Sequence, residues 1–248
     1  MTAAALRTPP FGLLTSELAQ ADVPDFVRTW LEHDPECPGV NSIPATARAI
    51  AAAFGAQTGG AASLTRSMAM HAVAEVVDPP HRPPGRLRLG TQAERDLLID
   101  WWVAFAAEAL AAGDADHAAR MVDARLGEGR AFVWDDDGPV SVVALSPAVA
   151  GVPRIGPVYT PPAYRRRGYA AMAVAEVSRR ALAAGAKRCM LFTDLANPTS
   201  NKIYAEVGYH RFGAWAEYRL DPPRNIAWTR RRISLGPPAK LKRFSGRG

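Results

Sequence analysis

A strand–helix–strand pattern in residues 154–195 constrains the fold more than any other feature of this sequence. Residues 154–160 (RIGPVYT) and 187–195 (KRCMLFTDL) are short runs typical of strands, and the alanine-rich residues 168–184 between them are typical of a helix that ends before Gly185. Two strands joined by a helix form a crossover unit within one layered sheet. The sequence therefore predicts an α/β fold with this unit at its centre.

The neighbouring segments extend this layer. Thr91 and Glu94 form a capping-box signature, which predicts a helix from about residue 91 to Gly113. An Asp-Gly pair between two apolar runs predicts a β-hairpin over residues 130–146. The remaining predicted elements are a strand at 86–89, a helix at 115–126, a helix at 197–208 capped by Asn197, and a strand at 213–220.

Residues 1–85 form an N-terminal segment that we predict to be mostly helical. Helical patterns begin near Pro24 and near Pro44, and the second ends before Gly55. Residues 58–63 are predicted to be a loop and residues 70–77 a strand. Residues 78–85 (DPPHRPPG) predict a linker, because Pro-Pro cannot continue a helix or a central strand. We therefore divide the chain into a segment of residues 1–85, a domain of residues 86–220 and a tail of residues 221–248.

The positive charge of the chain is concentrated in this tail. The formal net charge is +6, and residues 221–248 hold eight basic residues and one acidic residue, so residues 1–220 carry a net charge of −1. The tail has no apolar periodicity, and we expect it to be disordered. Nucleic acid is therefore an expected partner only through the tail.

The cysteines and the apolar runs exclude other classes of protein. Cys37 and Cys189 lie far apart, with no Cys/His cluster around them, so we expect reduced thiols and no metal site. The sequence shows no secretory signal and no apolar run of 18 residues. We expect a cytoplasmic protein that does not contact a membrane.

Residues 164–170 (YRRRGYA) place three arginines at the start of the helix predicted at 168–184. Positive charge is unfavourable there, because the helix dipole is already positive at its N-terminus. Gly168 allows a ligand to approach the backbone, the first-turn amides have no intrahelical partners, and arginines add charge-assisted hydrogen bonds. The pattern predicts an anion site. The alternative is a solvated run of arginines at a helix start.

A second polar pattern follows the strand at 187–195. On the helix predicted at 197–208, Asn197, Asn201 and Tyr204 are spaced four and three residues apart, so they share one face. Two amides and a phenol in this arrangement suit a ligand that contains amide groups. The alternative is that the asparagines are cap and surface residues and that Tyr204 packs in the core.

Together, the two patterns resemble the GNAT superfamily of acyl-CoA-dependent N-acetyltransferases. RIGPVYTPPAYRRRGYAAMAVA resembles the family's fourth strand, pyrophosphate loop and third helix, with Arg165, Gly168 and Ala170 in its Gln/Arg-x-x-Gly-x-Gly/Ala motif. TDLANPTSNKIYAEVGY resembles its fifth strand and fourth helix. The resemblance covers about residues 86–220 and is specific in 154–210. The segment before residue 86 resembles the accessory segment of a bacterial subgroup, or a degenerate half-domain.

The resemblance implies a fold class, a co-substrate and the residues that hold it. The fold is α/β (α+β layered), with a mixed, mostly antiparallel sheet, helices on both faces and a central β-α-β acyl-CoA-binding unit. The co-substrate is acetyl-CoA, the acyl donor. The backbone of Val158 and Thr160 would pair with the pantetheine, and Asn197 and Asn201 would orient the pantetheine or the helix start. The implied pyrophosphate ligands are Arg165, Arg166, Arg167, Gly168, Tyr169 and Ala170.

The implied reaction is direct attack of a neutral amine on the thioester. Tyr204 would be the general acid that protonates the departing thiolate. A strand amide, that of Thr160 or a neighbour, would hold the oxyanion.

The strands nearest the expected site offer no general base, because residues 138–163 contain no Asp, Glu or His. We propose Glu108, which lies on the long helix expected to face the acceptor. Asp135, His117, Glu217 and a water relay are the alternatives.

We therefore predict an N-acetyltransferase that moves an acetyl group from acetyl-CoA to a primary amine on a small molecule or a peptide. The alternative is a non-catalytic acyl-CoA-binding sensor module whose basic tail contacts nucleic acid. The complete phosphate loop and Tyr204 favour the enzyme. The identity of the acceptor and the oligomeric state do not follow from the sequence.

Overall fold

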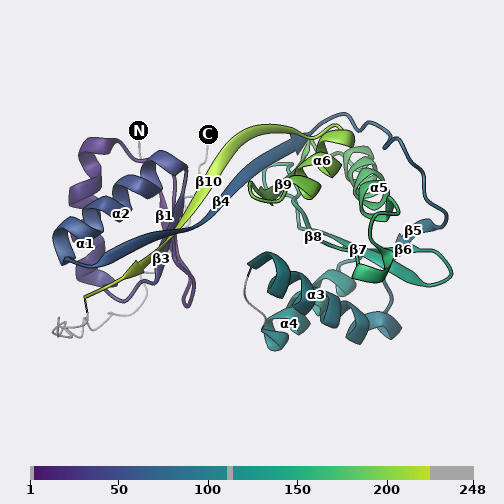
Figure 1. The fold of residues 1–248 in the computed structure, drawn as a ribbon, viewed down its shortest axis with the longest axis horizontal. Helices are drawn as coiled ribbons and strands as arrows, with labels where there is room; N and C mark the ends of the chain where they lie inside the picture. Colours follow the sequence, from purple (N-terminus) through teal and green to yellow (C-terminus); the bar gives the residue numbers. More distant parts are fainter. Residues whose placement is uncertain (1–2, 111–113, 224–248) are drawn as a thin grey trace, which may run out of the picture.

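The computed structural model describes residues 3–110 and 114–223, so nearly all of the predicted tail lies outside the described residues. The chain folds into two lobes that are joined by a long, arched pair of strands (Figure 1). The N-terminal elements are β1 (Ala5–Arg7), β2 (Leu13–Thr15), α1 (Val23–His33), β3 (Gly39–Ser42), α2 (Pro44–Thr58) and β4 (Ala61–Val73).

The remaining elements follow the predicted order from residue 86 onward. They are β5 (Arg86–Leu89), α3 (Arg95–Leu110), α4 (Ala115–Gly127), β6 (Ala131–Asp135), β7 (Pro139–Leu145), β8 (Ile155–Tyr159), α5 (Tyr169–Ala183), β9 (Cys189–Asp194), α6 (Pro198–Glu206) and β10 (His210–Asp221).

Local signals in the sequence explain several of these boundaries. Thr91 and Glu94 form the predicted capping box before α3, and the side chain of Asn197 accepts a hydrogen bond from the Ser200 amide at the start of α6. The β6–β7 turn places Asp137 and Gly138 at positive φ (53° and 130°), which Asp and Gly tolerate better than most residues. The hairpin predicted from the Asp-Gly pair is therefore confirmed.

The strands form two sheets. One has the order β5-β6-β7-β8, and all its pairs are antiparallel. The other has six strands in the order β1-β2-β3-β10-β4-β9. In this second sheet β4 lies between β9 and β10 and is antiparallel to both. The N-terminal segment therefore contributes a strand between two strands of the domain predicted at 86–220.

Helices cover both faces of the four-stranded sheet, because its strands alternate between two cores. Trp134 and Val143 belong to the core that includes α5, whereas Val133 and Val142 belong to the core that includes α3 and α4. A third core, which includes Val27 and residues of α2, packs α1 and α2 in the N-terminal lobe. The mixed α/β class with helices on both faces is confirmed.

The prediction that residues 1–85 are mostly helical is wrong, because the segment also contains four strands. Residues 61–63, predicted as part of a loop, begin β4. The first half of β4 is largely exposed and shows little apolar alternation, so the sequence carries no local strand signal there. Its strand conformation depends on pairing with β10, about 150 positions later in the chain.

Among the described residues, no helix is both long and apolar enough to cross a membrane.

Candidate active site

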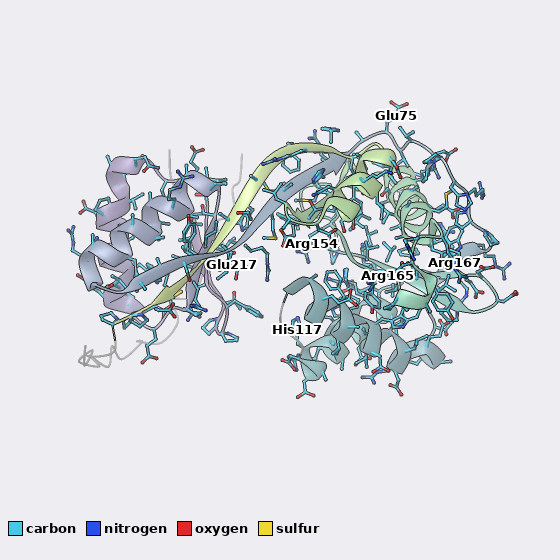
Figure 2. All side chains as sticks on the ribbon, in the orientation of Figure 1. Glu75, His117, Arg154, Arg165, Arg167 and Glu217 are labelled. Carbon is cyan, nitrogen blue, oxygen red and sulfur yellow. The ribbon has the colours of Figure 1, made fainter. Side chains whose placement is uncertain are left out.

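The two sheets separate between β8 and β9. These strands are parallel and are joined by the α5 crossover, but only one bridge, Arg154 to Met190, links them in the described residues. Arg154 precedes β8 and Arg165 follows it, and Figure 2 shows the two side chains well apart. The strands therefore meet at their N-terminal ends and have no bridge at their C-terminal ends. Ligands of α/β sheets bind at the carboxyl ends of strands.

The outer edge of β8 faces this split. The carbonyl of Tyr159 accepts a hydrogen bond from the Ser141 hydroxyl of β7 at 3.1 Å, so Tyr159 directs its backbone groups toward β7. Because successive residues of a strand direct their backbone groups to opposite edges, those of Val158 face the split. The register of β7 and β8 is irregular between Val143 and Leu145, where β8 contains an extra residue. Val158 therefore has the orientation needed to pair with an added ligand.

The loop of residues 160–168 connects β8 to α5. Its backbone turns through a 3-10 helix at Pro162–Tyr164, and Arg166 and Gly168 have positive φ values of 63° and 84°. Gly168 is the N-cap of α5 and offers no side chain to the first-turn amides. Among the described residues, no hydrogen bond occupies the amides of Tyr169 and Ala170. The N-terminus of α5 therefore presents free donors.

The space beside Gly168 is occupied by the chain itself. A Cβ atom at this position would lie 2.9 Å from the His81 Cδ2 atom and 3.6 Å from the Pro83 Cδ atom. Both neighbours belong to the linker of residues 78–85, which runs along α5. The sequence argument that Gly168 admits a ligand is therefore corrected: Gly168 is required by its positive φ and by the linker.

Tyr169 does not direct its ring toward a ligand. The ring is buried in the core under α5, and its hydroxyl donates a hydrogen bond to Asp136. This hydrogen bond raises the pKa of Tyr169, and nearby Arg167 opposes the rise. Only the backbone amide of Tyr169 remains available at the loop.

Arg165 is partly exposed, but its guanidinium binds other residues of the chain. Its Nη2 atom lies 2.9 Å and 2.7 Å from the two carboxylate oxygens of Glu108, and its Nε donates to the Thr160 carbonyl at 2.8 Å. The guanidinium also lies 5.6 Å from the centroid of the Tyr159 ring, and the Tyr159 hydroxyl donates to Glu108 at 3.2 Å. Arg165 therefore anchors the loop to β8 and α3.

These contacts change the role we expect for Glu108. The carboxylate predicted as a general base accepts hydrogen bonds from Arg165 and Tyr159, so both of its oxygens already have partners within the chain. Burial, and secondarily the Glu108 charge, raise the pKa of Tyr159. Thr160 is fixed as well, because its hydroxyl lies 2.8 Å from the Ser141 hydroxyl.

Arg166 and Arg167 are the exposed cations of the loop. Both side chains are solvent-exposed, and neither forms an ion pair within the described part of the chain. Figure 2 shows Arg167 at the start of α5, close to Arg165. Of the three arginines, these two have guanidinium groups available to a phosphate.

The two asparagines of the second pattern have structural partners. Asn197 caps α6 by accepting the Ser200 amide at 3.1 Å. The Oδ1 atom of Asn201 accepts the Thr193 hydroxyl at 2.5 Å, and its Nδ2 atom donates to the Asp194 carbonyl at 3.3 Å. Asn201 therefore fixes α6 to the end of β9, and it retains one amide proton for a ligand.

Tyr204 lies one turn beyond Asn201. Its ring packs edge to face with Tyr209, with centroids 6.0 Å apart and an interplanar angle of 63°. Among the described residues, the Tyr204 hydroxyl has no hydrogen-bond partner. Burial raises the pKa of Tyr204 to about 12. The phenol therefore stays protonated over the whole physiological range.

The other candidate bases lie elsewhere. Asp135 is bound by Arg88 and by the Gly138 amide. Glu217 pairs with Arg66 at 3.3 Å on the arched strands, and His117 lies on α4 beside Phe11. Figure 2 shows Glu217 and His117 away from the loop that carries Arg165 and Arg167.

Sequence reasoning missed His71, which lies on β4. His71 is only 8% exposed, and its Nε2 atom lies 3.3 Å from the Thr193 hydroxyl that donates to Asn201. Its Nδ1 atom is buried without a partner in the described structure. Burial, and to a lesser extent Arg211 and His210, lower the pKa of His71. Strand alternation with Ala69 and Val73 was the signal that could have placed it inside.

Neither cysteine contributes to the site. Cys37 and Cys189 are buried free thiols, and burial raises the pKa of Cys189 to about 11. Within residues 3–110 and 114–223, no group of three His, Cys, Asp or Glu side chains could hold a metal ion.

Comparison with known proteins identifies this domain. Residues 95–209 match the family model of the acetyltransferase (GNAT) family, so this part of the chain is a GNAT acetyltransferase domain. The matched region contains β8, the loop, α5, β9 and α6. A search of curated protein sequences gave no significant match.

Solved structures show the same fold over a longer part of the chain. A GCN5-related N-acetyltransferase from Sphaerobacter thermophilus has a TM-score of 0.60 at 16% identity, covering 89% of this chain and 76% of that one. A GCN5-related N-acetyltransferase from Kribbella flavida has a TM-score of 0.59 at 19% identity, covering 87% and 83%. Coverage this high includes part of residues 1–85, so at least part of the fold of the N-terminal segment recurs in these structures.

Proposed function

We propose that this chain transfers an acetyl group from acetyl-CoA to a primary amine by direct attack of the amine on the thioester. The observation that carries the proposal is the split between β8 and β9. Free amides and exposed arginines lie after one strand, and Tyr204 lies on the helix after the other. A phosphate-bearing thioester needs such an arrangement, because its anion and its reacting sulfur must be held at separate points.

The diphosphate of the co-substrate would bind at the start of α5. The amides of Tyr169 and Ala170 would donate to it, and Arg166 and Arg167 would add charge-assisted hydrogen bonds. Arg165 would act as a positioning residue, because its contacts with Glu108 and Thr160 hold the loop in place. The three arginines at a positive helix end are thus explained by one structural anchor and two phosphate contacts.

The pantetheine would lie along the open edge of β8. The backbone of Val158 would pair with a pantetheine amide, and Asn201 would donate its remaining amide proton. The Thr160 amide, or a neighbouring one, would hold the oxyanion of the tetrahedral intermediate. Fixed backbone donors suit this task because they need no reorganisation during the reaction.

Tyr204 would stabilise the departing thiolate. An ordinary thiol has a pKa of about 8.5, and the pKa of Tyr204 is about 12. A phenol this weakly acidic donates a strong hydrogen bond to a thiolate more readily than it gives up its proton. We therefore propose that Tyr204 stabilises the departing thiolate as a hydrogen-bond donor and keeps its proton, and that the thiolate leaves without taking a proton from the enzyme.

The amine would lose its proton to water rather than to Glu108. Glu108 is bound by Arg165 and Tyr159, so we replace its proposed role as general base with that of a positioning residue for the loop. A water relay agrees with the lack of Asp, Glu and His in residues 138–163.

Calorimetric titration of acetyl-CoA, followed by a screen of primary amines for release of free coenzyme A thiol, tests the function. We expect binding in the micromolar range and thiol release with at least one amine. A well-folded chain that does not bind acetyl-CoA would refute the proposal. Binding without turnover on any amine would instead favour the sensor module.

A further inference from the structure

A cleft of about 330 Å³ lies beside the end of β9. One wall belongs to β4, from the N-terminal segment, and the other to the end of β9 and the turn after it, from the GNAT domain. The two parts of the chain therefore build the cleft together. Its lining residues are Leu64, Thr65, Arg66, Ser67, Asp194, Leu195 and Ala196.

β4 has an open edge at this cleft. β9 pairs with residues 68–73 of β4, and the last contact is a hydrogen bond of 3.0 Å from the Leu195 amide to the Ser67 carbonyl. Among the described residues, the strand partner of residues 61–67 is β10 alone. No strand of the described residues therefore continues the position of β9 alongside residues 61–67 of β4.

The side chains of the cleft combine apolar surface with charge. Leu64 is 53% exposed and Leu195 is 42% exposed, although large apolar side chains are usually buried. Arg66 pairs with Glu217, and the Asp194 carboxylate accepts the Ala196 amide at 2.8 Å. Two exposed leucines thus lie between the charged residues Arg66 and Asp194. Such a surface can bind an apolar side chain of a ligand that is otherwise polar.

The cleft adjoins the helix that carries Tyr204. Ala196 is followed directly by Asn197, the cap of α6, and Tyr204 lies seven residues further along. Seven helical residues span on the order of 10 Å. Three residues of an extended peptide span about the same length. The length of α6 from its cap to Tyr204 therefore corresponds to about three extended peptide residues.

We propose that the cleft binds an extended peptide whose free amino terminus is the acetyl acceptor, an inference that rests on the proposed function. The peptide would add to the open edge of β4 and run antiparallel to it, continuing the direction of β9. An apolar side chain near its third position would pack between Leu64 and Leu195. The N-terminal segment thereby supplies the strand that binds the acceptor.

The register of β4 limits the length of this contact. The pairing of β4 with β10 shifts between Glu217 and Tyr218, so Thr65 is an extra residue in β4. A bulge of this kind interrupts regular pairing. We therefore expect two or three peptide residues to pair with β4, and the specificity to lie close to the acceptor amine.

Steady-state kinetics with a hexapeptide amide that has a free amino terminus and leucine at its third position tests the inference. The reference peptide has aspartate at that position. We expect the leucine peptide to have a KM at least tenfold lower. The Leu64→Asp, Leu195→Asp variant should raise the KM of the leucine peptide about tenfold and leave the calorimetric Kd of acetyl-CoA unchanged.

Two controls make the test specific. Leu89→Asp changes a leucine of β5 that is 48% exposed and lies outside the cleft lining, and it should leave both constants unchanged. N-methylation of the second and third peptide amides removes backbone donors and should raise the KM by about twofold to tenfold for each strand hydrogen bond lost.

Two outcomes separate this inference from the proposed function. If the wild type binds acetyl-CoA and acetylates small amines, but the cleft variant and the methylated peptide behave like their references, the peptide proposal is overturned and the acetyltransferase stands. If the wild type does not bind acetyl-CoA at all, the acetyltransferase itself fails.

Discussion

The strand ends on the two sides of the split differ in exposure and in charge. After β8, the loop keeps its charges at the surface: Arg166 and Arg167 are exposed, and the Arg165–Glu108 pair is about half-exposed. At the end of β9, the Asp194 side chain is charged and exposed. The groups behind it are neutral and at least partly buried, in the chain from His71 through Thr193 to Asn201 and in Tyr204 beside it. The first end suits capture of an anion from water, and the second suits a hydrogen-bond donor held in one position.

The largest effect is expected on the buried side. Tyr204→Phe keeps the ring against Tyr209 and removes only the hydroxyl, so we expect kcat to fall about 10²- to 10⁴-fold with little change in the Kd of acetyl-CoA. Because the pKa of Tyr204 is about 12, ionisation of Tyr204 should not lower the wild-type kcat below about pH 11.

Tyr218→Phe, on β10 in the N-terminal lobe, is the matched control for this substitution and should keep the wild-type kcat. A Tyr204→Phe enzyme with kcat within threefold of the wild type would show that the phenol does not assist the leaving group.

Substitutions on the exposed side should change the affinity for acetyl-CoA rather than kcat. Arg166→Glu, Arg167→Glu should raise the Kd of acetyl-CoA about 10- to 100-fold, because two charge-assisted contacts are reversed. The remaining affinity should depend less on salt than that of the wild type. Calorimetry at two ionic strengths measures both effects.

Arg28→Glu, Arg48→Glu changes the net charge equally on α1 and α2, in the N-terminal lobe. An equal loss of affinity in this control would mean that total charge, and not the loop, attracts the co-substrate.

Gly168 links the loop to the rest of the fold, and its replacement should reduce stability. Gly168→Ala forces a side chain to φ 84° and places its Cβ 2.9 Å from His81, so we expect a loss of about 1–3 kcal/mol in the free energy of unfolding. Urea denaturation measures the loss.

Gly129→Ala separates the two causes of this loss. Gly129 has a φ of 64° with no atom within 4 Å of its Cβ position, so it shows the backbone effect alone. Equal losses at the two sites would mean that the contact with His81 has no energetic consequence. His81→Ala in the Gly168→Ala background should recover only the part due to the contact.

The smallest effect should come from His71 and appear only in acid. The pKa of His71 is lowered in the folded protein, so the unfolded chain binds a proton more readily and stability falls as the pH drops below about 6.5. The contribution is at most about 2 kcal/mol between pH 7 and pH 5. His71→Gln should flatten the decline in the free energy of unfolding over this range, and exposed His33→Gln should not.

Local signals predicted the elements of residues 86–220 well, because caps, turn residues and apolar periodicity act within a few positions. The Thr91 capping box, the Asp137-Gly138 turn and the Asn197 cap are all present. The position of β4 could not be predicted in this way. Its partners β9 and β10 follow it by more than a hundred residues, and no periodicity in residues 61–67 indicates a strand.

The same limit applies to the candidate site. The sequence predicted Arg165 and Gly168 as pyrophosphate ligands and Glu108 as a general base, and it did not predict their contacts. The structure shows that Arg165 and Glu108 bind each other and that His81 fills the space beside Gly168. Such contacts join residues that are far apart in the chain. Nothing in a single sequence indicates which of these residues come into contact. For His71, alternation with Ala69 and Val73 indicates a buried position, whereas its contact with Thr193 of β9 has no signal in the sequence.

The central position of β4 also determines the order in which parts of the chain can fold during synthesis. During synthesis, β4 emerges from the ribosome long before β9 and β10, so both of its edges stay unpaired until residues 189–221 have been made. Long-range strand pairs of this kind form slowly, because the intervening chain must first be brought together. We therefore expect a nascent chain that ends before β10 to expose β4 to chaperones, and a chain that starts at residue 86 to lack the strand that joins β9 to β10.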